Sequence, residues 1–237
     1  MAEIADAFAA ALRLIVGLDA ELAQIIGLSI RVSLTAVVLA AIVGLPAGAA
    51  LAVFRFPGRR GVVVLLNALM GLPPVVVGLA VYLLLSRSGP IGFLGWLFTP
   101  AAMVVAQTIL IAPLIAAVAR QSMAELWAEY ADELRSLGVG PARTIATLLW
   151  DGRFGLLTAI LAGFGRASAE VGAVIMVGGN IAHVTRTMTT AIALETAKGE
   201  LALALGLGIV LLAISIGVNA AAYLVGEATR ASEASPA

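Results

Sequence analysis

The sequence predicts an all-α polytopic membrane protein, with about five transmembrane helices and an N-terminal interfacial helix. Hydrophobic residues make up 62% of the 237-residue chain, charged residues make up only 12%, and the mean hydropathy is +1.08. A soluble domain carries about 25% charged residues. The apolar residues also fall in long uncharged runs, and about 20 such residues in a helix cross a bilayer.

Several classes of site are excluded or disfavoured by composition. The chain has no Cys, which excludes disulfides, thiolate metal sites and Cys nucleophiles, and its single His disfavours a transition-metal site. It has no G-x-x-x-x-G-K-[ST] run, no G-x-G-x-x-G after a strand and no Ser-centred nucleophile elbow. We therefore expect no ATP hydrolysis, no cofactor or metal bound by this chain, and no nucleic-acid partner.

Residues 1–24 are expected to form the interfacial helix. The acidic start MAEIADAFAA lacks the basic region of a cleavable signal peptide. About a dozen apolar residues precede Asp19, which is too few to cross a bilayer. The alternative is an extra, short span. One helical face carries four apolar side chains, namely Phe8, Leu12, Ile15 and Val16.

A membrane domain is expected over 25–226, followed by a polar tail at 227–237. The first span carries Gly44 and Gly48, a spacing that marks close helix approach. In the second span Pro73 and Pro74 remove two backbone donors and must kink the helix. Gly178 and the residues after it interrupt the fourth. The five expected spans are 25–53, 62–85, 101–119, 155–177 and 201–225.

The placement of Lys and Arg predicts the orientation. With five spans, eight basic residues fall on one side of the membrane: Arg55, Arg59, Arg60, Arg120, Arg135, Arg143, Arg153 and Arg230. Four fall on the other side: Arg13, Arg87, Arg186 and Lys198. Basic residues are enriched in cytoplasmic loops. The loops 54–61 and 120–153 are therefore expected in the cytoplasm, with the N-terminus outside and the C-terminus inside.

The loop expected at 120–153 carries the sequence pattern of two short helices. Residues 131–137 can form a helix, and Gly138 and Gly140 can end it because Gly tolerates a left-handed backbone at a C-cap. Pro141 suits the first turn of the next helix. A helix–Gly–helix wedge between two spans offers a surface that a soluble partner can push. The alternative is an ordinary cytoplasmic loop.

Two polar groups interrupt the fourth span. Arg166 and Glu170 are four residues apart, so on one helix they would share a face and neutralise each other. Ionisable groups in a span usually face a bundle interior or an aqueous path. This face therefore either lines a translocation pathway and its gate, or holds an ion pair that locks helix packing.

The segment 180–200 is polar with an apolar seam. Its hydrogen-bond donors could contact an oxyanion in transit, and Arg186 adds charge. The chemistry favours instead a solvated external loop, with His183 an ordinary exposed residue. A helix is expected from Thr189 to Lys198, with Glu195 and Lys198 one turn apart. The donors are Asn180, His183, Thr185, Arg186, Thr187, Thr189 and Thr190.

The run DELRSLG (132–138) resembles the "EAA" loop of ABC-importer permease subunits. In that loop an acidic-small-small-x-x-x-Gly pattern forms a coupling helix that docks into the ATPase. Here Glu133 and Leu134 replace the two small residues, and Leu149-Trp150 stands where the loop usually ends in Leu-Pro. The spacing from Asp132 to Gly138 is kept.

Further stretches resemble the tungstate-uptake permeases, which are close relatives of molybdate permeases. The likeness covers nearly the whole chain after residue 25, and its most specific part is GGNI…TRTMTTAIALETAKGE. The stretches are FPGRR (56–60), NALMGLPPVVVGLAVYLLLSRSGPIGFLG (67–95), FTPAAMVVAQTILIAPLI (98–115), LLWDGRF (148–154) and FGRASAEVGAVIMVGGNIAHVTRTMTTAIALETAKGE (164–200).

This resemblance implies a MetI-like permease fold in the cell membrane, surrounded by lipid and working as a homodimer. Two ATPase subunits, which carry ATP and Mg²⁺, would dock at the cytoplasmic face, and an external binding protein would deliver the oxyanion. Coupling would fall to Asp132, Glu133, Leu134, Arg135, Leu137, Gly138 and Val139. The pathway and gate would be lined by Arg166, Ser168, Glu170, Gly179, Asn180, Thr185, Arg186 and Thr189.

Two other functional classes were weighed. A self-sufficient secondary transporter or channel for a small anion would be favoured by intramembrane carboxylates without a counter-charge, whereas here Arg166 stands near Glu170. An intramembrane enzyme would need a catalytic cluster, which the sequence lacks. Tungstate and molybdate have nearly the same size and charge, so the residues do not separate them.

Overall fold

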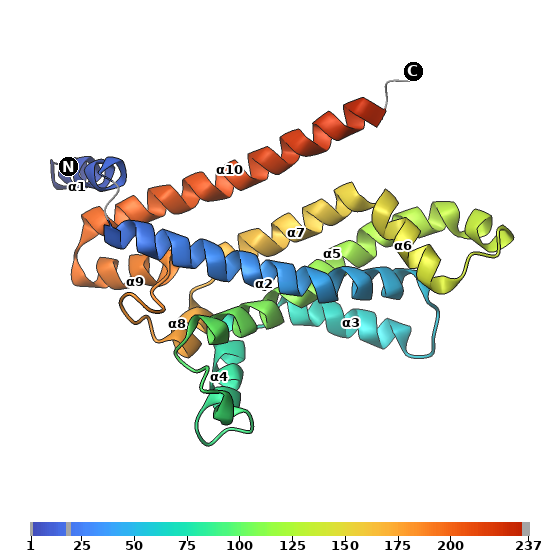
Figure 1. Cartoon of the computed structure of the whole chain (residues 1–237), viewed down its shortest axis with the longest axis horizontal. Coiled ribbons are helices and arrows are strands. Elements are labelled where there is room, and N and C mark those ends of the chain that lie inside the picture. The colour runs from blue at the N-terminus through green and yellow to red at the C-terminus, as the bar shows by residue number, and fades with distance from the viewer. Residues whose placement is uncertain (1, 18–19, 234–237) are drawn as a thin grey trace. The chain divides into compact units, whose positions relative to one another are not determined.

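The computed structural model describes residues 2–17 and 20–233, and this part of the chain is helical, without β-strands (Figure 1). The predicted all-α class is confirmed. The helices are α1 (Ala2–Val16), α2 (Ala20–Val53), α3 (Arg59–Met70), α4 (Pro74–Leu85), α5 (Pro100–Ser136), α6 (Pro141–Asp151), α7 (Arg153–Ser168), α8 (Gly172–Gly178), α9 (Met188–Lys198) and α10 (Leu201–Glu233), with a 3₁₀ turn, η1, at Gly92–Leu94.

Three helices of the described residues, α2, α5 and α10, are long and apolar enough to cross a membrane. The count rises to five if each of two bent helix pairs is one span. The first pair is α3 with α4, bent by 98°, and the second is α6 with α7, bent by 75°. The predicted number of five equals the higher count, but that count takes α6 with α7 as one span where the sequence predicted a span at 155–177.

The kink expected in the second span lies where the prolines place it. Gly71 ends α3, Pro73 is the N-cap residue of α4, and Pro74 occupies the first helical turn. A proline in this turn removes only an N–H that has no partner in the helix. The two prolines therefore end one helix and begin the next.

Two span boundaries were predicted wrongly. The third span was expected to end at residue 119, before a loop, but α5 continues as one helix to Ser136 despite Pro113. The fourth was expected to be continuous from 155 to 177, but α7 ends at Ser168 and α8 begins only at Gly172. The region 120–153 is thus mostly helical, and the fourth span is broken near its middle.

A separate N-terminal helix is present as α1, but it ends at Val16, and residues 20–24, expected to belong to it, are the start of α2. Its place at a membrane interface stays a prediction. Leu14 packs against the core cluster of Leu22, Ile25, Met188, Ala191 and Leu207. At the other end α10 extends beyond the expected span to Glu233. Residues 227–233 of the expected tail are therefore helical, while 234–237 lie outside the described residues.

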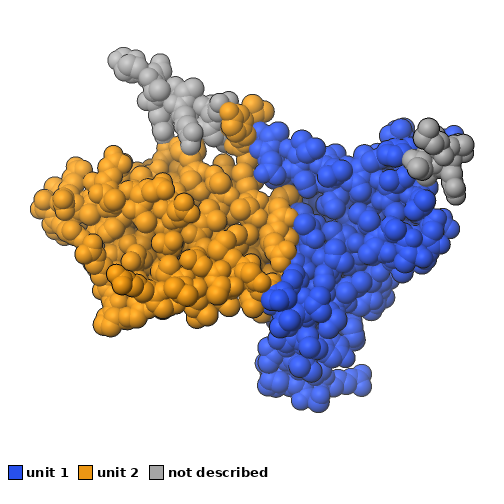
Figure 2. Space-filling model, turned by 180° about the vertical axis from the view of Figure 1, so that it is seen from behind, with its two compact units in different colours: residues 1–36, 73–107, 167–220 blue, residues 37–72, 108–166, 221–237 orange. Residues whose placement is uncertain are grey.

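The chain divides into two compact units, coloured separately in Figure 2. Unit 1 comprises residues 1–36, 73–107 and 167–220, and unit 2 comprises 37–72, 108–166 and 221–237. In unit 1, α4 packs on α8 so closely that a Cβ on Gly78 would lie 2.9 Å from the Cα of Ala173.

In unit 2, the Gly44 and Gly48 pair allows the close helix approach that its spacing predicts. A Cβ on Gly44 would lie 3.0 Å from the carbonyl oxygen of Ala112, and one on Gly48 would lie 2.5 Å from that of Ala116. Both of these neighbours belong to α5. The two glycines therefore set the distance between α2 and α5.

Candidate functional site

The elbow, residues 129–153, lies in unit 2 and comprises the end of α5, the turn after it, α6 and the bend into α7. Helix α5 ends in a Schellman motif, because Gly138 N–H donates to the Arg135 carbonyl at 3.0 Å and Val139 N–H donates to the Leu134 carbonyl at 3.1 Å. Gly138 has a φ of +65°, the left-handed conformation that the sequence predicts for it. Pro141 then begins α6, also as predicted.

Two large apolar side chains of the elbow are exposed, one at its tip near Gly138 and one at the end of α6. The side chain of Leu137 is 70% exposed and that of Trp150 is 71% exposed. Of the seven residues predicted to couple, Leu134 and Val139 are half-buried, and the exposed ones are Asp132, Glu133, Arg135, Leu137 and Gly138. Large apolar side chains exposed among charged ones are typical of a docking surface.

The base of the elbow is anchored on α5. Leu148 of α6 is fully buried, and Thr144 is 4% exposed. The bend between α6 and α7 falls at Gly152, where a Cβ would overlap the terminal carbon of Met123. The Arg153 guanidinium donates to the Trp150 carbonyl at 2.9 Å, which ties the bend together. Because its base is packed, a force applied by a partner at the exposed tip of the elbow can be transmitted to α5 and α7.

The break segment, residues 167–190, lies in unit 1 and begins between α7 and α8. Gln107 Nε2 donates to the Ala167 carbonyl at 3.1 Å, and Thr189 Oγ1 donates to the Glu170 carbonyl at 2.8 Å. The Glu170 carboxylate accepts a hydrogen bond from Ala173 N–H at 3.0 Å. Within a membrane a helix break is tolerated where protein groups satisfy its backbone. These three side chains do so.

The helical arrangement expected for Arg166 and Glu170 is wrong, whereas their mutual neutralisation stays a prediction. Arg166 lies in the last turns of α7, but Glu170 lies after the end of that helix, and the two residues belong to different units. They therefore do not share one helical face. Glu170 is 4% exposed, and Ser168, the last residue of α7, is half-buried.

The second half of the break segment is partly packed and partly exposed. Thr185 is fully buried; its Oγ1 donates to the Gly178 carbonyl at 2.6 Å and accepts from Ile181 N–H at 2.9 Å. Gly179 and Asn180 both have positive φ, at 72° and 50°. The favoured prediction of a solvated external loop therefore fits residues 181–184, which are exposed, but not Thr185, Thr187 and Thr190, which are buried.

The hydroxyl groups predicted as oxyanion donors are engaged within the chain. Thr187 and Thr190 form the capping box that begins α9, and both are buried. The helix itself is confirmed, and so is its ion pair, since Lys198 Nζ lies 3.0 Å from the Glu195 carboxylate. The hydroxyls of these threonines are hydrogen-bonded within the segment, so they stabilise its backbone and are already used by partners in the chain.

The loop before α9 is tied to the start of α2 by two polar pairs. The Arg186 guanidinium lies 3.3 Å from the Glu21 carboxylate. His183 Nδ1 and Gln24 Oε1 are 2.8 Å apart, and Gln24 Nε2 donates to the His183 carbonyl at 3.1 Å. His183 is exposed, as expected, and the described residues contain no cluster of three possible metal ligands.

Sequence reasoning missed the residues that support the break segment. Gln107 carried a usable signal, because it is a buried amide within a long apolar run. Ser29, whose Oγ accepts from Met188 N–H at 2.7 Å, carried none, because 159 residues separate the two. Glu21 and Gln24 likewise could not be predicted as partners of the loop before α9, because they are distant from it in the sequence.

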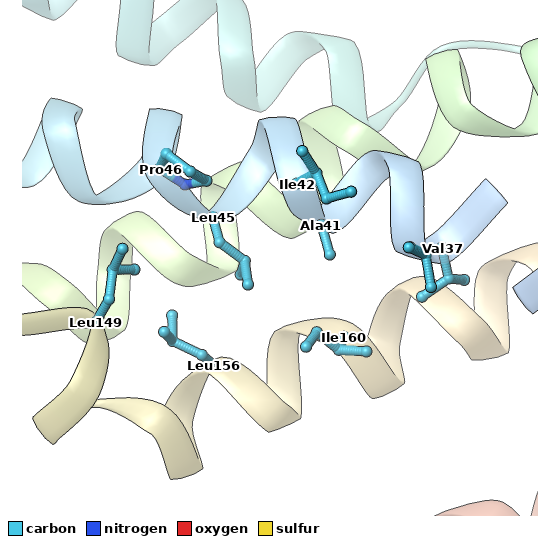
Figure 3. A pocket seen from close by; sticks show the side chains of 9 residues that line it. Val37, Ala41, Ile42, Leu45, Pro46, Leu149, Leu156 and Ile160 are labelled. Carbon is cyan, nitrogen blue, oxygen red and sulfur yellow. The ribbon is translucent and has the colours of Figure 1, made fainter. Parts of the chain in front are cut away.

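Unit 2 also holds an apolar recess of about 470 Å³ (Figure 3). Its walls come from α2 on one side and from α6 and α7 on the other. An oxyanion would lose its hydration there without gaining a donor, so this recess is no site for one. The lining residues are Val37, Val38, Ala41, Ile42, Leu45, Pro46, Leu149, Leu156 and Ile160.

The chain is similar to several proteins of known classification. It is 43% identical over 205 residues to a probable anion ABC transporter permease protein of Haloferax volcanii, covering 84% of this chain and 88% of that one. It is 39% identical over 200 residues to the tungstate uptake system permease protein TupB of Peptoclostridium acidaminophilum, with the same two coverages. TupB of Campylobacter jejuni is 37% identical over 149 residues, which is 63% of this chain and 62% of that protein. No family model matches the chain.

Proposed function

This chain belongs to the family of ABC transporter permease proteins, and from that premise we propose that it is the membrane subunit of an ATP-driven importer for tungstate, or else for molybdate. The observation that carries the proposal is the 39% identity to a tungstate uptake permease over 84% of this chain. The proposal includes no catalytic role for this chain. ATP and Mg²⁺ would be bound by a partner ATPase.

The assembly we propose is a homodimer of this chain on two ATPase subunits, with an external binding protein on the opposite face. The exposed apolar side chains of the elbow support it, since Leu137 at its tip and Trp150 at the end of α6 present apolar surface for a partner. A chain without a nucleotide-binding motif also needs an outside source of energy for uphill transport.

The proposed location is the inner or plasma membrane of the cell, with the N-terminus outside and the C-terminus in the cytoplasm. Its support is the excess of Lys and Arg in loops 54–61 and 120–153. In this orientation the elbow faces the cytoplasm, where an ATPase works, and the loop before α9 faces the binding protein.

The proposed mechanism is alternating access. ATP binding closes the ATPase pair, the two elbows move, and the pathway opens outward to the loaded binding protein; hydrolysis then resets it. The break segment, with Glu170, Gly179, Asn180, Thr185, Arg186 and Thr189, together with Arg166 and Ser168, forms the pathway and gate in this proposal. A pathway that bound a dianion tightly would not release it, so selectivity belongs mainly to the binding protein.

The test is uptake of labelled tungstate by the complete complex in vesicles, with the binding protein and ATP. We expect ATP-dependent uptake, with unlabelled tungstate competing better than molybdate. Stronger competition by molybdate would reassign the substrate. Uptake by the isolated chain, driven by an ion gradient without the ATPase, would overturn the importer proposal in favour of a secondary transporter.

A further inference from the structure

We propose that a cleft of unit 2, formed partly by the elbow, binds the phosphate headgroup of an anionic phospholipid. The cleft has a volume of about 300 Å³. It is lined by the end of α2 and the residues after it, by the second half of α5, and by the turn into α6. Its lining residues are Val53, Phe54, Arg55, Trp127, Arg135, Val139, Pro141 and Thr144.

The charged residues of this lining are both arginines. Arg55 has no hydrogen bond or ion pair within the part of the chain that the structure describes. Arg135 lies 3.5 Å from Asp132, whose side chain is fully exposed, so water weakens that pair. A guanidinium presents paired N–H donors that match two oxygens of a phosphate. The cleft therefore offers two such groups to one anion.

Arg55 is not required to complete the end of α2. The neighbouring Arg59 does that, because its Nε donates to the Leu51 carbonyl at 2.8 Å and its Nη2 to the Ala52 carbonyl at 3.5 Å. These carbonyls have no partner within the helix. The capping role is filled by Arg59, which leaves the guanidinium of Arg55 available for a ligand.

The rest of the lining favours a lipid over a free oxyanion. The rings of Phe54 and Trp127 and the side chains of Val53, Val139 and Pro141 form an apolar wall. A free dianion gains nothing from such a wall, whereas the glycerol and first acyl carbons of a lipid do. Arg135 also lies over the Trp127 ring at 5.3 Å, so an aromatic and a cationic group meet there.

The expected depth of the cleft in the membrane agrees with the level of the lipid headgroups. Helix α2 is long and apolar enough to span the membrane and ends at Val53, so residues directly after it lie at the level of the lipid headgroups. Basic groups at this level bind anionic headgroups, and aromatic rings are enriched there. The inference does not depend on which oxyanion is transported.

The test is quenching of Trp127 fluorescence by brominated lipids. The chain has three Trp, and replacing Trp96 and Trp150 by Phe leaves Trp127 as the reporter. In nanodiscs of the full chain we expect brominated phosphatidylglycerol to quench more strongly than brominated phosphatidylcholine. Arg55→Gln should lower this preference about fivefold, the effect of one basic side chain at an anionic surface. Arg60→Gln, an exposed arginine outside the lining, is the matched control and should leave the preference unchanged.

Three results would overturn the lipid assignment. Equal quenching by the two lipids would remove it, and so would an Arg60→Gln loss as large as that of Arg55→Gln. Relief of quenching by millimolar inorganic phosphate or tungstate would assign the cleft to a free oxyanion instead. If Arg55→Gln fails to fold, Arg55→Lys, which keeps the charge but loses the paired donors, should still show a weakened preference.

Discussion

The elbow of unit 2 and the break segment of unit 1 each interrupt a helix, but the two interruptions are stabilised by different kinds of hydrogen bond. In the break segment, Glu170 and Thr185 are buried and hydrogen-bonded to backbone. At the elbow, the turn at Gly138 is satisfied by backbone alone, and Leu137 is 70% exposed. A break away from water needs side-chain partners, whereas a break in water can leave its side chains for another protein.

The glycines repeat this difference. A Cβ on Gly178 would lie 3.0 Å from the sulfur of Met103, and one on Gly78 would contact α8 backbone. At Gly138 and Gly140 a Cβ would meet nothing within 4 Å. At Gly78 and Gly178 glycine allows close packing, while at Gly138 and Gly140 it serves the turn. The contrast indicates that the break segment has a fixed, closely packed conformation, whereas the elbow presents an exposed turn that a partner could contact.

The largest effect is expected at the tip of the elbow. Leu137→Asp should weaken retention of the partner ATPase at least about 30-fold, as loss of a central interface residue does, because it places a charge in the proposed contact. Co-purification with the ATPase measures it. Helical content and thermal stability should stay unchanged, since this side chain packs little within its own chain.

A matched control for the elbow is Arg87→Glu, which changes an exposed charge in a loop of unit 1. It should retain the ATPase fully. Full retention by Leu137→Asp as well would show that the elbow is not the docking surface, and the contrast between the two regions would lose its functional meaning.

A smaller effect is expected in the break segment, and on stability instead of association. Glu170→Ala removes the carboxylate that accepts from Ala173 N–H and should lower the free energy of unfolding by about 2 kcal/mol. Glu170→Gln keeps an acceptor oxygen and should cost less. Thermal unfolding in detergent measures both. An alanine variant as stable as the parent would contradict a supporting role for this carboxylate.

A comparison of Gly78 with Gly140 provides a third prediction. Gly78→Ala should destabilise by about 1 kcal/mol or more, because its Cβ would lie 2.9 Å from the backbone of α8. Gly140→Ala should be neutral, since its φ of −69° suits any residue and its surroundings are open. Thermal unfolding of the two variants side by side tests the pair, and equal losses would refute the contrast.

The smallest effect is expected for the ion pair between Glu21 and Arg186. Glu21→Gln should cost less than about 1 kcal/mol, because the Glu21 side chain is 46% exposed and water screens the pair. The loss should shrink further in about 1 M salt, where the Debye length is about 3 Å. A larger loss that is insensitive to salt would mean that this contact belongs to the buried framework.

The elbow could be predicted from sequence because its determinants are local. Gly138 ends a helix through its own backbone freedom, and Pro141 begins one through its fixed φ, so neither needs a distant partner. The prediction failed on how far α5 extends, since the charges after residue 119 suggested a loop. Charged residues are equally compatible with a helix that leaves the membrane and continues in water.

The break segment could not be predicted because its determinants are distant. Nothing near Glu170 in sequence states that α7 ends at Ser168, since Gln107 and Thr189 supply the bonds that make a break tolerable. The same holds for Thr185, whose hydroxyl is buried by the fold and not by its neighbours in the chain.

What the sequence by itself determined is the all-α membrane class, the cap at Gly138 and the family likeness. Hydropathy, helix capping and motif spacing depend on residues close together in the chain, so they can be recognised from the sequence alone. Only the tertiary structure decided which polar groups are buried, where the fourth span breaks, and that Arg55 and Arg135 line one cleft. Burial and polar satisfaction depend on residues far apart in the chain, and packing alone brings them together.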